Sequence, residues 1–340
     1  MRSRNGMTRI LELLISVATL LAVGIGATGE DAGSGLLPLA GSWTPPAGAH
    51  AGRAPSAKGM VEIRGLGTFE FEPPQIQALR KDLFRPGHFS VFDVLASLAK
   101  AGMIPMEYSY DESLGTYVIE SLNGKSGWWY DAHYAGGAFE RPVVRMDEYP
   151  VKDGMAIQVY LESPDRLAAI THDFAEQVAR LRSNGGRVVV PKVTVRSPRA
   201  TLTFNDVGVT AHNVRSDVFQ TGVISVLDVL LSLGEQGRLS SLELAWRDRM
   251  ENADAVDNYF VDQIRTEDYS TEAAGDCTYV HEVGSEALMG FLAPHGHAAS
   301  HVHLTADVEV LTSPEYVEFL WACLEDARAS GENKNPQAKD

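Results

Sequence analysis

The chain has 340 residues, enough for two domains of ordinary size, and 44% of them are hydrophobic, which excludes general disorder and a multi-span membrane protein. Its 45 acidic residues outnumber its 29 basic ones and give a net charge of -16. That charge repels phosphate backbones, so we expect no nucleic-acid partner.

The N-terminus has the pattern of an export signal. Basic residues within 1–9 precede an apolar run, 10–27, that ends in small residues. We predict a signal peptide at 1–27 and an exported protein that is extracellular, periplasmic or associated with the cell envelope. A buried helix and an uncleaved membrane anchor are the alternatives. Residues 28–58 are rich in Gly, Ala, Pro and Ser, which predicts a flexible linker.

The remainder contains an internal duplication. Asp82–Gly102 returns without a gap as Asp217–Gly237, 135 positions later. Because this repeat is too long for a solenoid unit, it indicates two copies of one domain. We predict domains at 59–184 and 187–330, followed by a disordered tail at 331–340. Features shared by the copies are expected to serve the fold, and features in one copy are candidates for function.

Each copy contains four strand patterns, with alternating apolar residues and β-branched or aromatic side chains. These patterns are Val61–Arg64, Thr68–Phe71, Thr116–Leu122 and Ala156–Leu161 in the first copy and Val193–Arg196, Thr201–Phe204, Tyr259–Ile264 and Val308–Leu311 in the second.

A helix is expected after the second strand of each copy. Ser90 with Asp93, and Ser225 with Asp228, resemble capping boxes in which Asp replaces the usual Glu or Gln. These serines and acids are therefore predicted to cap helices rather than to catalyse a reaction.

Each copy is also predicted to close with a second helix. Ser163–Asp165 and Ser313–Glu315 both contain an N-cap serine, a proline for the first helical position and an acid for the first turn. Apolar residues with helical spacing follow in both copies. They are Leu167, Ile170, Phe174, Val178 and Leu181 in the first and Tyr316, Phe319, Leu320, Cys323 and Leu324 in the second.

This order of elements predicts an α+β fold made of two tandem β-grasp-like domains. The first copy resembles the domain-of-unknown-function family related to the C-terminal domain of transcobalamin, through Ser90–Leu95, Gly115–Gly124, Gly127–Tyr130 and Val151–Gly154. The second copy lacks the family's Asn-Gly, Gly-Trp and Asp-Gly features and joins it only by likeness to the first. The resemblance implies an exported binding or surface module, and in transcobalamin the related domain helps to hold a corrinoid.

An aromatic strand is specific to the first copy. Trp128, Trp129 and Tyr130 are followed by His133. Alternation on a strand turns Trp128 and Tyr130 to one face and Trp129 to the other. Core packing is one interpretation of this strand, and a stacking face for a corrinoid, a haem or a glycan is the other.

A histidine cluster is specific to the second copy and contains His295, His297, His301 and His303. On a strand, His301 and His303 project from one face, and imidazole ligands favour Zn, Cu or Ni. A divalent transition metal is therefore a candidate cofactor, and the alternative is a solvated histidine-rich loop.

His281 could complete this metal site. In an ungapped alignment of Gly127–Gly136 with Gly275–Gly284 it falls at the step of His133, so a shared structural histidine is the alternative. Cys277 is a candidate soft ligand or, after export, a disulfide partner of Cys323. A buried free thiol is the remaining interpretation of Cys323.

We expect an exported, non-catalytic protein that binds a small ligand or a cell-surface partner, and membrane contact only through an uncleaved N-terminal segment. A purely structural envelope protein and an enzyme with a site between the domains are the alternatives. No P-loop, dinucleotide fingerprint, nucleophile elbow or His-Glu-x-x-His motif appears in the sequence.

Overall fold

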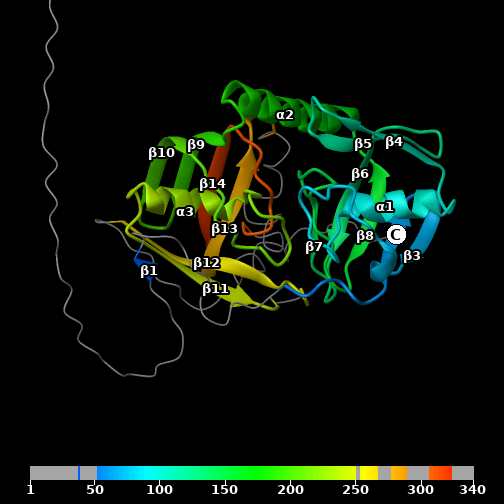
Figure 1. The fold of residues 1–340 in the computed structure, drawn as a ribbon, viewed down its shortest axis with the longest axis horizontal. Helices are drawn as coiled ribbons and strands as arrows, with labels where there is room; N and C mark the ends of the chain where they lie inside the picture. Colours follow the sequence, from blue (N-terminus) through cyan, green and yellow to red (C-terminus); the bar gives the residue numbers. More distant parts are fainter. Residues whose placement is uncertain (1–36, 39–51, 250–252, 267–276, 289–305, 324–340) are drawn as a thin grey trace, which may run out of the picture. The chain divides into compact units, whose positions relative to one another are not determined.

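The strand and helix patterns of the sequence give the mixed fold drawn in Figure 1. The structure is a computed structural model that describes residues 37–38, 52–249, 253–266, 277–288 and 306–323, and these ranges belong to one compact unit. The described part contains separate sheets and few helices, so the α+β class is confirmed.

The elements of the first repeat follow the predicted order. They are β2 (Gly59–Ile63), β3 (Gly67–Phe71), η1 (Pro73–Gln75), α1 (Val91–Lys100), β4 (Met106–Asp111), β5 (Thr116–Leu122), β6 (Trp128–His133), β7 (Phe139–Glu140) and β8 (Ala156–Leu161).

A long helix and the second repeat follow. The elements are α2 (Pro164–Ser183), β9 (Val189–Arg196), β10 (Thr201–Gly208), α3 (Leu227–Glu235), β11 (Ser241–Arg247), β12 (Asn258–Arg265), β13 (Cys277–Gly284) and β14 (Tyr316–Cys323). A short strand before the first repeat, β1 (Leu37–Pro38), pairs with β11.

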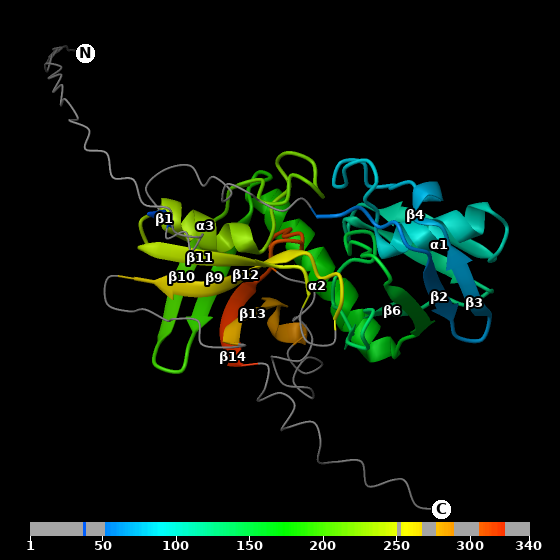
Figure 2. The same ribbon diagram turned by 90° about the horizontal axis from the view of Figure 1, so that it is seen from below.

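The two repeats share the order of four equivalent strands, β3-β2-β8-β6 and β10-β9-β14-β13. The strand order is β3-β2-β8-β6-β7 in the first repeat and β10-β9-β14-β13-β12-β11-β1 in the second, where Figure 2 shows β11 and β12 beside each other. In each repeat the first strand pairs in parallel with the last: Val61 faces Ile157, and Val193 faces Val317. Other pairings are antiparallel.

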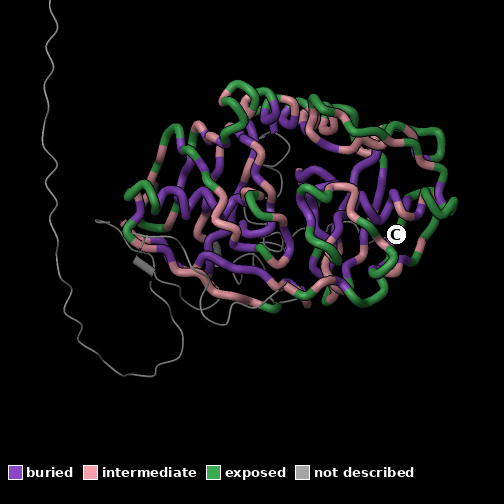
Figure 3. The backbone as a smooth tube through the Cα atoms, in the orientation of Figure 1, coloured by how far each residue is buried: buried purple, intermediate pink, exposed green. Residues whose placement is uncertain are grey.

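The duplicated helix packs on its own sheet in each repeat, and buried residues gather along the strands and the helix faces turned toward them (Figure 3). At α1 the predicted capping box is present: the Ser90 side chain accepts from the Asp93 N–H, and the Asp93 carboxylate accepts from the Ser90 N–H at 2.7 Å. This confirms the capping interpretation in the first repeat.

The predicted N-cap at Ser225 is wrong by one residue. Helix α3 begins at Leu227, and the residue before it, Val226, makes no side-chain cap. The Asp228 carboxylate still accepts from the Ser225 N–H at 2.6 Å, but the Asp228 N–H turns to the Ser225 carbonyl at 3.1 Å. Only half of the capping box therefore forms in the second repeat.

The closing helix predicted for the second repeat is a strand. Residues from Tyr316 to Cys323 form β14, between β9 and β13, with Val317 and Phe319 fully buried. A short apolar run fits helical and strand spacing alike, and here aromatic and β-branched residues fill the vacant central position of the sheet. The motif at Ser313 thus precedes a strand, whereas Ser163 follows one and caps α2.

The strand predicted at Val308–Leu311 is instead a turn with a single bridge to Ser225. Its Ala306 and Glu309 carbonyls accept from the first N–H groups of the helix, at 2.7 and 2.9 Å. The first repeat has the same turn before β8, where residues 146 and 149 accept in the same way. These turns cap the exposed backbone donors of each helix start.

Helix α2 begins and ends as predicted. Its face at Ile170, Phe174 and Val178 is buried, and Leu181 packs against the core of the second repeat. Gly185 and Gly186, both with positive φ, then end the helix before β9.

The two repeats contact each other through equivalent residues. Phe84 and Phe219, at matching positions of the duplication, form an antiparallel bridge with ring centres 5.5 Å apart. The Arg85 N–H donates to the carbonyl of residue 218 at 2.9 Å, and the Gln220 N–H donates to that of residue 83 at 2.8 Å. Such reciprocity is the mark of a two-fold interface.

The described part of the predicted linker is bound to the fold. The Ser56 and Ala57 N–H groups each donate to Asp153 at 2.7 Å, and the Gly52 N–H donates to Asp217 at 2.5 Å. The composition of this segment did not predict these contacts, because they are made by backbone N–H groups. The predicted signal peptide and the predicted tail lie outside the described residues.

Candidate functional site

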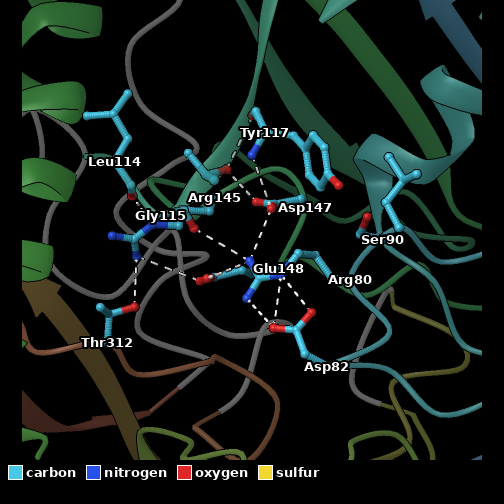
Figure 4. A network of polar contacts seen from close by, with 12 residues as sticks. Arg80, Asp82, Ser90, Leu114, Gly115, Tyr117, Arg145, Asp147, Glu148 and Thr312 are labelled. Carbon is cyan, nitrogen blue, oxygen red and sulfur yellow. Dashed lines mark hydrogen bonds and ion pairs between the residues drawn. The ribbon is translucent and has the colours of Figure 1, made fainter. Parts of the chain in front are cut away.

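A largely buried arginine, Arg80, anchors the first repeat and is drawn in Figure 4. Arg80 donates through Nη1 to Asp147 at 3.2 Å and through Nε to Asp82 at 3.0 Å. The buried Asp147 carboxylate also accepts from the Thr116 hydroxyl and, at 3.2 Å, from the Tyr117 N–H. The guanidinium thereby ties the segment before α1 to the turn at Asp147 and to the start of β5.

The second repeat contains the same anchor. Arg215 donates to Asp307 at 2.9 Å and to Asp217 at 3.0 Å, and the Asp307 carboxylate accepts from the Tyr259 N–H at 2.9 Å. Because both repeats build this network at matching positions, we assign it to the fold rather than to a ligand.

A second buried arginine occurs where the repeats meet. Arg145 donates to the Leu114 carbonyl at 3.0 Å, to Gln177 at 3.0 Å and to Thr312 of the second repeat at 3.1 Å (Figure 4). Beside it, burial raises the pKa of Glu148 to about 7, against the opposing effect of the Arg145 charge. The pocket here, of about 20 Å³, has room for little more than one water molecule.

Strand register shows which residues of the two repeats are equivalent. The hairpins β4–β5 and β11–β12 both shift register at one step, after Glu107 and after Glu243. Counting from these shifts, Ile119 of β5 corresponds to Val261 of β12. In the central strands, Trp128 of β6 likewise corresponds to Tyr279 of β13.

These equivalences expose a difference between the sheets. In the second repeat Val261 pairs with Tyr279 and joins β12 to β13. In the first repeat Ile119 and Trp128 do not pair, and within the described ranges β5 has β4 as its only strand partner. The first sheet is therefore interrupted between β5 and β6.

A cavity of about 150 Å³ occupies this interruption. Strands β5 and β6, helices α1 and α2 and the loops beside them form its walls. The lining residues are Phe92, Leu114, Thr116, Tyr117, Val118, Ile119, Gly127, Trp128, Trp129, Met146, Leu167, Thr171 and Phe174. Most of these side chains are apolar, and the partly exposed Val118, Ile119, Leu167 and Thr171 place the cavity near the surface.

Two of the predicted ligand-binding residues reach this cavity. Trp128 and Trp129 are both largely buried, and their indole N–H groups donate to the carbonyls of Lys125 at 2.8 Å and Pro142 at 2.9 Å. These bonds fix both rings. The Trp129 side of β6 offers no open stacking face, because α2 covers it through Phe174, with ring centres 6.3 Å apart.

The other two do not line the cavity. Tyr130 is fully buried, donates to the Val144 carbonyl at 3.0 Å and packs on Tyr149. His133 stacks on the exposed Phe139, with ring centres 5.6 Å apart. The four aromatic and histidine residues that the sequence grouped as one binding surface therefore do not share one site in the structure.

The alignment of His281 with His133 is wrong. His281 pairs with Phe319 in β13, at the position where Tyr130 pairs with Val159 in β6. His281 therefore corresponds to Tyr130, and the shared-histidine interpretation fails. The ungapped alignment missed this because the loop before β13 is longer than the loop before β6.

His281 is buried and pairs with a carboxylate. Its Nε2 lies 2.6 Å from Glu309, and Glu309 is the counterpart of Tyr149. An aromatic pair of the first repeat is thus replaced by an imidazole and a carboxylate. The predicted ligands His295, His297, His301 and His303 lie outside the described residues. Among the described residues, no three His, Cys, Asp or Glu side chains are placed to hold a metal ion.

The two cysteines are opposite each other in neighbouring strands. Cys277 of β13 and Cys323 of β14 are Cα partners, and Cys277 is disulfide-bonded. Directly opposed residues of an antiparallel pair lie roughly 4.5–5.5 Å apart, within the Cα range of disulfides. The strand register is compatible with the predicted bridge.

Comparisons of the chain with protein-family models, curated proteins and solved structures find no match. Of the helices in the described ranges, none is long and apolar enough to cross a membrane.

Sequence reasoning found one wall of the cavity and missed the rest. Thr116–Leu122 was correctly predicted as a strand, but the sequence did not show that this strand does not pair with β6. The α2 residues Leu167 and Phe174 were predicted as one packing face, and part of that face borders the cavity.

Proposed function

We propose that the protein is an exported, non-catalytic binding protein whose first repeat takes a small apolar ligand, or the apolar end of a larger one, between β5 and β6. The observation that carries this proposal is the cavity at a strand junction that the second repeat closes. A void of this kind forfeits packing energy, so its retention in one repeat favours a role in binding.

The fold and the N-terminus support the wider setting. Each repeat combines a strand pair, a helix and further strands, with its first and last strands parallel at the centre. We propose on this basis two β-grasp-like domains, similar to the transcobalamin-related family. The basic and apolar pattern of residues 1–27 supports export.

The size and chemistry of the cavity limit the ligand. Its volume of about 150 Å³ suits one ring or a short branched chain. Pockets for drug-sized ligands measure roughly 300–1,000 Å³, so a haem or corrinoid macrocycle does not fit inside. The Thr116 and Thr171 side chains and the free edge of β5 can orient a polar substituent.

Toluene is a suitable probe, because an apolar cavity of this size accepts a single aromatic ring. Isothermal titration calorimetry of the full chain should give a dissociation constant on the order of 0.1–1 mM, as for a ligand of few atoms. A Thr171→Phe variant fills the cavity and should abolish the heat of binding.

The matched control is His172→Phe, which adds the same ring at the neighbouring exposed position of α2. It should bind toluene as the unaltered chain does. If the unaltered chain binds no toluene, or if Thr171→Phe binds it equally well, the cavity is not a ligand site and a structural role is favoured.

A transition metal is a second candidate ligand, because the second repeat places an imidazole and a carboxylate in contact at His281 and Glu309. Both are Zn ligand types. Metal analysis of untagged protein should show one bound Zn, Cu or Ni, lost in His301→Ala/His303→Ala and kept in His172→Ala. Absence of metal, or micromolar or weaker affinity, would overturn this candidate.

A further inference from the structure

A second difference between the repeats lies just before the anchoring arginines. The pairs Phe69 with Val61 and Phe204 with Val193 match the hairpins, so residues 69–102 correspond to 204–237 without a gap. In the second repeat β10 continues to Gly208. In the first, Pro73 begins the turn η1 and ends β3 earlier, since proline cannot continue a paired strand.

In the second repeat this segment fills the space beside α3. The His212 ring is almost wholly buried, with Nδ1 3.0 Å from Asp228 and Nε2 3.1 Å from Glu235. The Thr210 N–H donates to the Ser232 hydroxyl at 3.0 Å. Burial works against a charged ring, but the carboxylates of Asp228 and Glu235 outweigh it and raise the pKa of His212.

The same place is hollow in the first repeat. A pocket of about 410 Å³ lies between α1 and the segment after η1. Its wall on α1 contains Asp93, Ser97 and Lys100, which are the counterparts of the three α3 residues that hold His212 and Thr210. The counterpart of His212 is Gln77, which lines the pocket instead of filling it.

One position of the pocket wall carries the opposite charge in the second repeat. Lys100 stands where the second repeat has Glu235, and Lys81 is a second cation in the wall. Neither ammonium group makes an ion pair with another described residue. Ser97 and Gln77 add neutral donors and acceptors, and burial raises the pKa of Asp93 at the inner wall.

We propose that this pocket binds a small hydroxylated organic anion, with its acidic group at Lys81 and Lys100 and its hydroxyls at Ser97 and Gln77. The volume lies within the range of small-molecule sites. The protein's net charge of -16 opposes such a ligand at long range, so affinity depends on the local pair of lysines. This site is separate from the cavity between β5 and β6.

Calorimetry with D-glucuronate and with D-glucose 6-phosphate tests the proposal, with D-glucose as the neutral probe. We expect at least one anion to bind, glucose to bind at least tenfold more weakly, and binding to weaken as salt is raised. The two anions distinguish a carboxylate site from a phosphate site. Failure of both anions to bind overturns the proposal.

Two variants use the second repeat as the guide. Lys100→Glu introduces the residue of the second repeat and should weaken anion binding at least tenfold, and Gln77→His should also weaken it by filling the pocket. Lys125→Glu makes the same charge change at an exposed position away from the pocket and should leave binding unchanged. If Lys100→Glu and Lys125→Glu weaken anion binding equally, the effect comes from the net charge of the protein, and the proposed site is overturned.

Toluene binding separates this proposal from the proposed function. Lys100→Glu should still bind toluene, and Thr171→Phe should still bind the anion. A variant that loses both ligands has lost its fold, so the thermal unfolding of each variant is measured beside its binding.

Discussion

The two repeats share a topology but differ in how completely each is filled. In the second repeat, β12 pairs with β13 and His212 packs along α3. In the first repeat, the corresponding places hold a cavity of about 150 Å³ and a pocket of about 410 Å³. The second repeat shows that the fold does not require either opening. The cavity and the pocket therefore arise from the sequence of the first repeat.

The shared features should matter most for stability. Arg215→Ala leaves the buried Asp307 carboxylate without its partner and should cost about 3–5 kcal/mol of unfolding free energy. Arg80→Ala should cost somewhat less, because Arg80 is partly solvated. Denaturant titration measures both. Arg199→Ala, an exposed control, should stay within about 0.5 kcal/mol, and equally small effects of all three would refute the shared anchor.

The predicted disulfide belongs to the second repeat alone. A bridge between Cys277 and Cys323 closes a loop of 46 residues by subtraction and should contribute roughly 3–4 kcal/mol on the chain-entropy model. Reduction of the unaltered chain should lower its melting temperature, and a Cys277→Ser/Cys323→Ser variant should show no such response. Free thiols in the untreated, non-reduced protein would contradict the pairing.

A buried acid distinguishes the first repeat. Glu148 has a pKa of about 7 in the folded protein, and Val308 occupies the matching place in the second repeat. A raised carboxyl pKa gives stability that is complete below the unfolded pKa of 4.5 and is lost as pH rises to about 7. Relative to the unaltered chain, Glu148→Gln should therefore gain roughly 2–3 kcal/mol between pH 4 and pH 8. A pH-independent difference in denaturant titrations would contradict this.

The smallest expected difference in stability between the repeats is at the starts of helices α1 and α3. Ser90→Ala removes the side-chain acceptor of the Asp93 N–H and should cost about 1 kcal/mol or more. Ser225→Ala removes a hydroxyl that donates to Asp228 but caps no helix N–H, and it should cost less. The two variants are compared in one denaturant series. A larger loss at Ser225 would reverse the ranking.

Local patterns predicted much of the fold. The strands at Thr116–Leu122 and Ala156–Leu161, the cap at Ser90 and the packing face of α2 followed from alternation, capping and helical spacing. The element at Tyr316 was misassigned because its spacing fits both structures, and only the position between β9 and β13 decides the outcome.

The candidate sites were harder to predict. Trp128 and Trp129 were found by composition, but the cavity beside them depends on β5 leaving β6, which is a long-range property. The second pocket had a local signal, since Pro73 stands where the second repeat continues its strand. That signal is visible only when the two copies are compared.

A crystal structure under xenon pressure tests the central comparison most directly, because xenon enters apolar cavities without needing polar contacts. We expect xenon between β5 and β6, in contact with Trp128 and Phe174, and none between β12 and β13. Xenon at neither junction, or equal occupancy at both, would contradict the claim that the first repeat is open where the second is closed.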